Sequence, residues 1–271
     1  PKMSQWQARS KYTATASLCN TSGTLAKIAR ILGKTEDAAK YKELSRKVAD
    51  AYCSVLTDGN GKTKEEFQTA YVLPLYLNMF PENVKAKAAE NLVKLVEKND
   101  YKIGTGTPYI LFALADNGHA DTAYKMLLNT QCPSWLYEVR VGATTVWERW
   151  DGLDENGECP IGDDGTDMMI SYNHYASGAV GAFLYRRVLG VEPTEAGYRK
   201  FKFAPVVGGG ITEAEGTVGT PYGVIKAAWK IADGEMTMTV AVPVGTECTV
   251  VLPSGEEKVL GSGEYTVTAK A

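Results

Sequence analysis

Apolar side chains recur at every third or fourth position through most of the chain up to about Gly190, a spacing that places them on one face of a helix. The first and the last of these stripes along the chain are followed by Gly33 and Gly190, and glycine is common just after the end of a helix. In chain order the stripes are Leu25, Ile28, Ala29 and Leu32; Tyr41, Leu44, Val48, Tyr52 and Val55; Val84, Ala88, Leu92 and Leu95; and Ala176, Ala179, Val180, Phe183, Leu184 and Val188. The pattern predicts that this part of the chain is mainly α-helical.

Start signals support the predicted helices. Glu36 and Asp37 fall in the first turn of one helix, where acidic side chains are favourable. Pro81 opens another helix, and Thr107-Pro108 is a good N-cap and first-turn pair for a third. We expect about seven helices joined by short loops, and short loops make neighbouring helices antiparallel, as in a run of αα-hairpins.

After about Gly190 the pattern changes to short β-rich runs separated by turns that contain glycine and proline. These runs cover residues 224–229, 236–242, 249–252 and 264–268. Short strands at this spacing indicate a small antiparallel β-sandwich. The sequence therefore predicts a mainly α protein with a C-terminal β-domain, divided into residues 1–192 and 193–271.

The densest cluster of chemically capable residues lies in residues 130–173, a long aromatic-rich segment between helices. Trp135, Trp147 and Trp150 fall within sixteen residues of one another, beside a carboxylate. Aromatic faces can stack on the apolar faces of pyranose rings, whereas carboxylates and amides bind hydroxyl groups. Hydrolysis of a glycosidic bond needs two carboxyl groups on opposite sides of that bond. Glu148, flanked by Trp147 and Trp150, is the best candidate for one of them.

Several motifs in this chain closely resemble the bacterial α-L-rhamnosidase family of glycoside hydrolases (glycoside hydrolase family 78). The central one is G-A-T-T-V-W-E-R-W-D at 142–151, with P-S-W-L-Y before it and S-Y-N-H-Y-A-S-G-A-V after it. The resemblance extends to F-Q-T-A-Y-V-L-P-L-Y at 67–76, T-P-Y-I-L-F-A-L at 107–114 and T-P-Y-G-V-I at 220–225. It thus covers nearly the whole chain, and W-E-R-W-D together with N-H-Y is a highly specific combination.

The resemblance implies a six-hairpin α/α toroid followed by a β-domain, and hydrolysis of terminal α-L-rhamnosyl linkages with inversion. Glu148 would be the general base that activates water, and His174 would line the sugar pocket. Trp135, Asn173 and Trp147 would also bind the substrate. The family's general acid lies in an acidic motif upstream of Pro1, so we expect the acid to come from outside this chain. About seven helices are also too few for six hairpins, which indicates a partial toroid.

Each of these residues also has a purely structural interpretation. Glu148 could be a carboxylate paired with Arg140 or Arg149, and His174 could be a core histidine bonded to a backbone carbonyl. The tryptophans could simply be core residues. Asp163, Asp164 and Asp167 suggest calcium, but they lack the spacing of an EF-hand loop, so a solvated loop is the better interpretation. We expect no metal and no organic cofactor.

Composition narrows the classes of partner. A formal net charge of −3 provides no basic field for nucleic acid and no polybasic membrane anchor. No apolar run approaches the roughly 20 residues of a membrane helix. The five cysteines are scattered and form no C-x-x-C pair, which favours reduced thiols and a cytoplasmic location.

The sequence thus predicts an inverting α-L-rhamnosidase that is catalytically incomplete as this chain, acting in its complete form on rhamnose-containing glycosides or oligosaccharides. Two alternatives remain open: an inverting toroid glycosidase for another sugar, and a non-catalytic carbohydrate-binding or scaffold fragment. Because an incomplete toroid exposes apolar helix faces, we also expect self-association or pairing with the missing N-terminal part.

Overall fold

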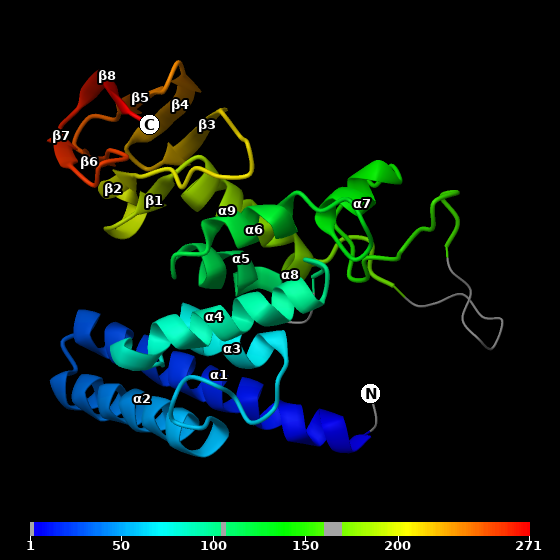
Figure 1. The fold of residues 1–271 in the computed structure, drawn as a ribbon. Coiled ribbons are helices and arrows are strands. Elements are labelled where there is room, and N and C mark those ends of the chain that lie inside the picture. The colour runs from blue at the N-terminus through cyan, green and yellow to red at the C-terminus, as the bar shows by residue number, and fades with distance from the viewer. Residues whose placement is uncertain (1–2, 104–106, 160–169) are drawn as a thin grey trace. The chain divides into compact units, whose positions relative to one another are not determined.

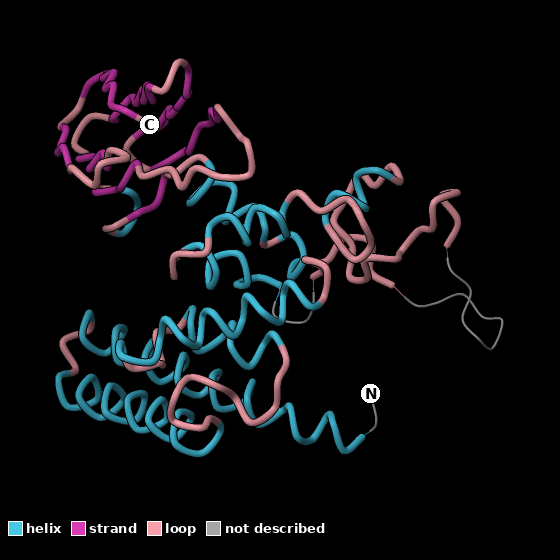
Figure 2. The backbone as a smooth tube through the Cα atoms, in the orientation of Figure 1, coloured by secondary structure: helices cyan, strands magenta, loops and turns pink. Residues whose placement is uncertain are grey.

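The computed structural model describes residues 3–103, 107–159 and 170–271, and it divides the chain into two compact units, Pro1–Gly178 and Ala179–Ala271. Figure 1 shows the helices of the first unit and the sheets of the second, and Figure 2 shows how helices give way to strands along the chain. A helical region followed by a β-domain is therefore confirmed. Asp163, Asp164 and Asp167 lie outside the described residues.

The first unit is built from helices. In chain order they are α1 (Met3–Ile31), α2 (Thr35–Leu56), α3 (Gln68–Tyr76), α4 (Glu82–Lys98), α5 (Thr107–Ala115), α6 (Ala120–Leu127), α7 (Trp135–Arg140) and α8 (Tyr175–Gly178). Successive helices α1 and α2, α3 and α4, and α5 and α6 pack against each other, as expected for αα-hairpins. Three aromatic side chains join α1, α2 and the start of α3: Tyr12 meets both Tyr52 and Phe67 edge to face, at 5.8 and 5.4 Å between ring centroids.

Most of the apolar stripe predicted for α1 is exposed. Leu25, Ile28 and Leu32 are 40%, 47% and 64% exposed, whereas the buried side chains of this helix include Tyr12 and Ala16. The helix is present, and of the four stripe residues only Ala29 is buried, so most of this apolar face is left uncovered. The spacing of apolar residues identifies a face, and the neighbouring element decides whether that face is covered.

The stripe before Gly190 is divided among three short elements instead of one helix. They are α8, α9 (Val180–Phe183) and η1 (Leu184–Val188), a π-helical turn. The division between the two compact units falls after α8. Such π-turns interrupt the regular hydrogen-bond ladder of a helix, which periodicity in the sequence does not reveal.

The second unit contains two four-stranded sheets. Their strands are β1 (Val191–Pro193), β2 (Lys200–Phe203), β3 (Glu213–Thr220), β4 (Gly223–Ala232), β5 (Glu235–Val242), β6 (Glu247–Val251), β7 (Glu257–Leu260) and β8 (Gly263–Lys270), with a short 3₁₀ turn, η2 (Ala196–Tyr198), after β1. One sheet has the order β1-β2-β6-β7 and the other β3-β4-β5-β8. The pairing is antiparallel except between β2 and β6, which run parallel. The predicted β-domain is thus largely, but not wholly, antiparallel.

Side chains from both sheets form the core of this unit, including Phe201 and Phe203 of β2 and Trp229 of β4. The Trp229 indole N–H donates to the carbonyl of Val188 at 2.8 Å, so the end of η1 is tied to the sheet. Burial alternates along β5, as expected for strands with one face on a core.

Candidate active site

A short helix, α7, lies near the start of residues 130–173, the segment in which the sequence predicts the catalytic residues. Ser134 is its N-cap, and the Ser134 hydroxyl accepts a hydrogen bond from the Tyr137 amide at 3.1 Å. The Trp135 indole N–H donates to the Ser177 carbonyl at 2.9 Å, and its ring meets Trp150 edge to face at 5.5 Å. Through these two contacts Trp135 joins α7 to α8 and to the loop that follows α7, and its side chain is only 6% exposed.

Two loops from different parts of the segment run side by side and bring the candidate residues together. The His174 amide donates to the Val146 carbonyl, and the Glu148 amide donates to the Ser171 carbonyl, both at 2.8 Å. The Thr145 hydroxyl also contacts the Tyr172 carbonyl. The W-E-R-W-D and S-Y-N-H-Y motifs are thus adjacent in space, which their separation in the sequence did not require.

Glu148 is held at this junction with its side chain exposed. Its carboxylate accepts a hydrogen bond from the Ser171 amide at 3.1 Å. Asn173 is exposed and His174 is half-buried in the adjacent loop. An exposed carboxylate with one oxygen held by a backbone amide can accept a proton from a water molecule, and a nearby amide and imidazole can bind hydroxyl groups.

The alternative ion-pair partners of Glu148 have partners of their own. Arg140 pairs with Glu155 at 2.9 Å, and Arg149 pairs with Asp151 at 2.7 Å. The Arg149 guanidinium holds the pKa of Asp151 below its usual range. Both arginines near Glu148 thus form ion pairs with other acidic residues, and these pairs hold the surrounding loop.

Trp147 belongs to the loop that carries Glu148, and it is only 2% exposed. Its ring meets Tyr172 edge to face at 5.7 Å, which adds a side-chain contact between the two loops. Gly152 passes close to the ring: a Cβ there would lie 2.7 Å from Cε3 of Trp147 and 2.9 Å from Cδ1 of Ile170. Because Trp135 and Trp147 are both buried, each leaves little surface for a ligand.

Glu138 of α7 is a buried carboxyl that the motifs did not single out. It is 2% exposed, and its Oε2 accepts a hydrogen bond from the Trp147 amide at 3.3 Å. Burial raises the pKa of Glu138 to about 7, and the bond from the Trp147 amide opposes that rise. One signal was available in the sequence: an acidic residue inside the otherwise apolar and aromatic run W-L-Y-E-V.

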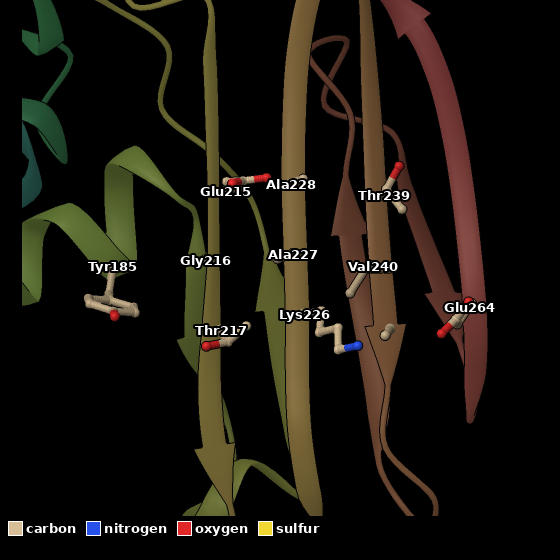
Figure 3. Close-up of a pocket in the computed structure, with 11 residues that line it drawn as sticks. Tyr185, Glu215, Gly216, Thr217, Lys226, Ala227, Ala228, Thr239, Val240 and Glu264 are labelled. Atoms are coloured by element: carbon tan, nitrogen blue, oxygen red, sulfur yellow. The ribbon is translucent and has the colours of Figure 1, made fainter.

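A separate hollow of about 570 Å³ lies in the second unit, on the β3-β4-β5-β8 sheet, and contains none of the predicted site residues. Figure 3 shows Tyr185 at one side of it, with Thr217 and Lys226 from neighbouring strands and Glu264 farther along the sheet. Its lining is mostly small or polar, with two carboxyl groups, Glu215 and Glu264, and one aromatic ring, Tyr185.

The described part of the chain contains no group of three or more His, Cys, Asp or Glu side chains arranged to hold a metal ion. All five cysteines are free thiols. Among the residues with described structure, no helix has the length and apolar character to cross a membrane.

Each of the two units matches a domain found in known proteins. Residues 3–188 match the model of the bacterial α-L-rhamnosidase six-hairpin glycosidase domain, and residues 190–266 match the bacterial α-L-rhamnosidase C-terminal domain. The chain is 37% identical over 244 residues to an α-L-rhamnosidase of Streptomyces avermitilis, an alignment that covers 89% of this chain and 23% of that protein.

Solved structures give the same picture. The native α-L-rhamnosidase of Aspergillus terreus is 37% identical, with a TM-score of 0.87 over 93% of this chain and 30% of that one. The α-L-rhamnosidase of Streptomyces avermitilis, solved in complex with L-rhamnose, is 33% identical, with a TM-score of 0.86 over 96% of this chain and 27% of that one. The chain therefore spans about a quarter of the length of the curated relatives that it matches.

Proposed function

Because the chain belongs to the bacterial α-L-rhamnosidase family, we propose that it carries the water-activating half of an active site that hydrolyses terminal α-L-rhamnosyl linkages with inversion. Glu148 is the general base in this proposal. The observation that carries it is the exposed Glu148 carboxylate, held by the Ser171 amide at the point where the two motif-bearing loops meet.

The chemistry assigned to Glu148 follows from the needs of an inverting reaction. One carboxylate removes a proton from water as the water attacks the anomeric carbon, while a carboxylic acid on the other side protonates the leaving oxygen. The two carboxyl groups stand about 6.5–9.5 Å apart to leave room for that water. An exposed carboxylate meets the requirement for access to water, and its fixed oxygen limits the directions in which it can reach.

Asn173 and His174 are proposed to bind rhamnose hydroxyl groups beside the base. Their loop is bonded to the Glu148 loop through the His174 amide, so their side chains and the Glu148 carboxylate belong to one supported surface. Trp135 and Trp147 are proposed to border the sugar. Their burial leaves each of them little surface for that contact and makes holding the loops their larger role.

The general acid is proposed to come from another part of the whole protein. This chain alone would then have little or no hydrolytic activity, because the loss of one member of an acid–base pair removes a contribution of typically 10²–10⁴-fold. The substrates proposed for the whole protein are rhamnose-containing glycosides or oligosaccharides.

The exposed stripe of α1 supports a second proposal about assembly. Leu25, Ile28 and Leu32 present apolar side chains on a single helix, and contiguous exposed apolar surface usually marks a contact with another surface. We propose that this stripe packs on another part of the whole protein, and that the chain by itself self-associates through it.

Turnover of p-nitrophenyl α-L-rhamnoside by this chain and by an upstream-extended chain tests the proposed function. The extended chain should be active and this chain should not, and the extended chain should leave aryl glucosides and mannosides intact. Turnover of another aryl glycoside in place of the rhamnoside would support a different sugar. Sugar binding without any turnover by the extended chain would support a non-catalytic binding module.

A further inference from the structure

Glu138 faces inward from a helix whose other charged side chain faces outward. In α7, Arg140 reaches an exposed ion pair with Glu155, whereas Glu138 is almost completely buried. A short, capped helix thus directs one carboxyl into the protein beneath the loop that carries the proposed base.

Glu138 holds that loop at two points. Its backbone carbonyl accepts from the Ala143 amide at 2.9 Å, and its side-chain Oε2 accepts from the Trp147 amide at 3.3 Å. The next amide along the loop, that of Glu148, donates in a different direction, to the Ser171 carbonyl. Consecutive amides at Trp147 and Glu148 are therefore fixed by two separate segments, which defines where the Glu148 side chain leaves the backbone.

The second oxygen of Glu138 makes this arrangement costly. Oε1 is buried and has no hydrogen-bond partner among the described residues. Burying a polar atom without a partner is unfavourable, and burying an unpaired charge is more so. Among the described residues, the bond from the Trp147 amide is the one hydrogen bond of the Glu138 side chain, and it offsets part of the cost of burying this carboxyl group.

Glu138 also lies close enough to titratable neighbours to affect them. The pKa of Cys132, in the segment before α7, is raised mainly by burial, then by Asp151, with a smaller rise from Glu138 and an opposing effect of Lys102. The rise in the pKa of Glu138 itself comes from burial, opposed by the Trp147 amide. Because the Trp147 amide is hydrogen-bonded to the Glu138 carboxyl, a change in the protonation of Glu138 should affect this amide most strongly.

We propose that Glu138 is a positioning residue for Glu148, acting through the Trp147 amide to fix the loop from which the base projects. This inference rests on the proposed function of Glu148 for its catalytic consequence, but the contact itself does not. Glu138 would not touch the substrate. Misplacing a catalytic group by about 1 Å can cost about 10²-fold in rate, so a support one residue away can matter to turnover.

The contact is tested first without activity, by following the ¹⁵N–¹H resonance of the Trp147 amide in this chain as a function of pH. In the wild-type chain it should titrate with a midpoint near the pKa of about 7. Glu138→Gln should abolish that titration, because the amide oxygen still accepts a hydrogen bond but does not ionise. Glu155→Gln, which neutralises an exposed carboxyl near α7, should leave it intact. A Trp147 resonance that titrates equally in Glu138→Gln would overturn the proposal.

Kinetics of the upstream-extended chain test the consequence for Glu148. Glu138→Leu, which has no acceptor, should lower kcat by about 10- to 100-fold with KM changed less than about threefold. Glu138→Gln should recover most of that loss, which a purely space-filling role would not predict. Unchanged kcat in a folded Glu138→Leu variant would overturn the positioning role. If Glu148→Gln were fully active, the proposed function would fail while the Trp147 titration still reported on the contact.

Discussion

Glu148 and Ser171 are joined in both directions, because the Glu148 amide donates to the Ser171 carbonyl at 2.8 Å and the Ser171 amide donates to the Glu148 carboxylate at 3.1 Å. Both contacts use the main chain of Ser171. The serine hydroxyl instead accepts a long bond from the Asn173 amide at 3.4 Å. The position of the carboxylate is therefore set by the path of the second loop and not by the identity of the side chain at position 171.

Ser171→Ala should accordingly be well tolerated. The two bonds to Glu148 survive the change, so we expect kcat of the upstream-extended chain to stay within about threefold of the wild-type value, as for substitutions that remove no buried or specific contact. Steady-state kinetics on p-nitrophenyl α-L-rhamnoside provide the measurement. A loss of a hundredfold or more would mean that the hydroxyl itself acts at the site.

The stability of the chain should fall as the pH rises towards neutrality, because of Glu138. Burial raises its pKa from an ordinary 4.5 to about 7, so between these values the folded chain retains a proton that the unfolded chain has released. The shifted pKa of Glu138 contributes on the order of 3 kcal/mol to the free energy of unfolding below about pH 4.5, and this contribution is lost as the pH rises through about 7.

Urea unfolding across that pH interval measures this dependence. The fall in unfolding free energy should be clearly smaller in Glu138→Gln than in the wild type, since the amide does not titrate. Glu155→Gln removes an exposed carboxyl and should leave the slope unchanged. Parallel slopes in wild type and Glu138→Gln would show that Glu138 ionises normally in the folded chain.

Gly152→Ala should destabilise the candidate site. The added Cβ would lie 2.7 Å from the Trp147 ring, and a ring held by Tyr172 and the surrounding core cannot move away freely. Overpacking of this kind costs about 1–3 kcal/mol. Gly181→Ala, in α9, meets nothing within 4 Å and serves as the matched control. Thermal unfolding that affects both variants equally would contradict close packing at Gly152.

Ile28→Lys should reduce self-association of the isolated chain. Ile28 lies at 47% exposure on the α1 stripe with Leu25 and Leu32, and a charge there opposes burial of the stripe against another surface. Sedimentation velocity should show wild-type association that weakens in Ile28→Lys but not in Val244→Lys, a change at an isolated apolar side chain that is 83% exposed. A wild-type chain that sediments as a clean monomer would contradict the assembly proposal.

The sequence predicted the fold class because helical and strand periodicities are local properties. The helix α2 and the strand at residues 236–242 could be predicted directly, since each depends on neighbours in the chain. The helix that leaves its apolar face exposed, the π-turn of η1 and the parallel pairing of β2 with β6 could not, because each depends on contacts between distant segments.

The candidate site was predictable as a set of motifs but not as an arrangement. Glu148 and His174 stood out through their aromatic and amide neighbours, and the resemblance to a known family assigned them roles. Glu138 was missed because a lone glutamate in a helical run resembles an ordinary surface residue. Its importance appears only when folding buries it against the Trp147 amide.

Glu148→Gln in the upstream-extended chain, compared with Glu155→Gln at saturating p-nitrophenyl α-L-rhamnoside, shows whether Glu148 is the group that takes the proton from water. Glutamine keeps the shape and an acceptor for the Ser171 amide but cannot take a proton from water. We expect kcat to fall by at least about 10²-fold in Glu148→Gln and to stay near the wild-type value in Glu155→Gln. A Glu148→Gln variant that turns over substrate like the wild type would show that another group is the base.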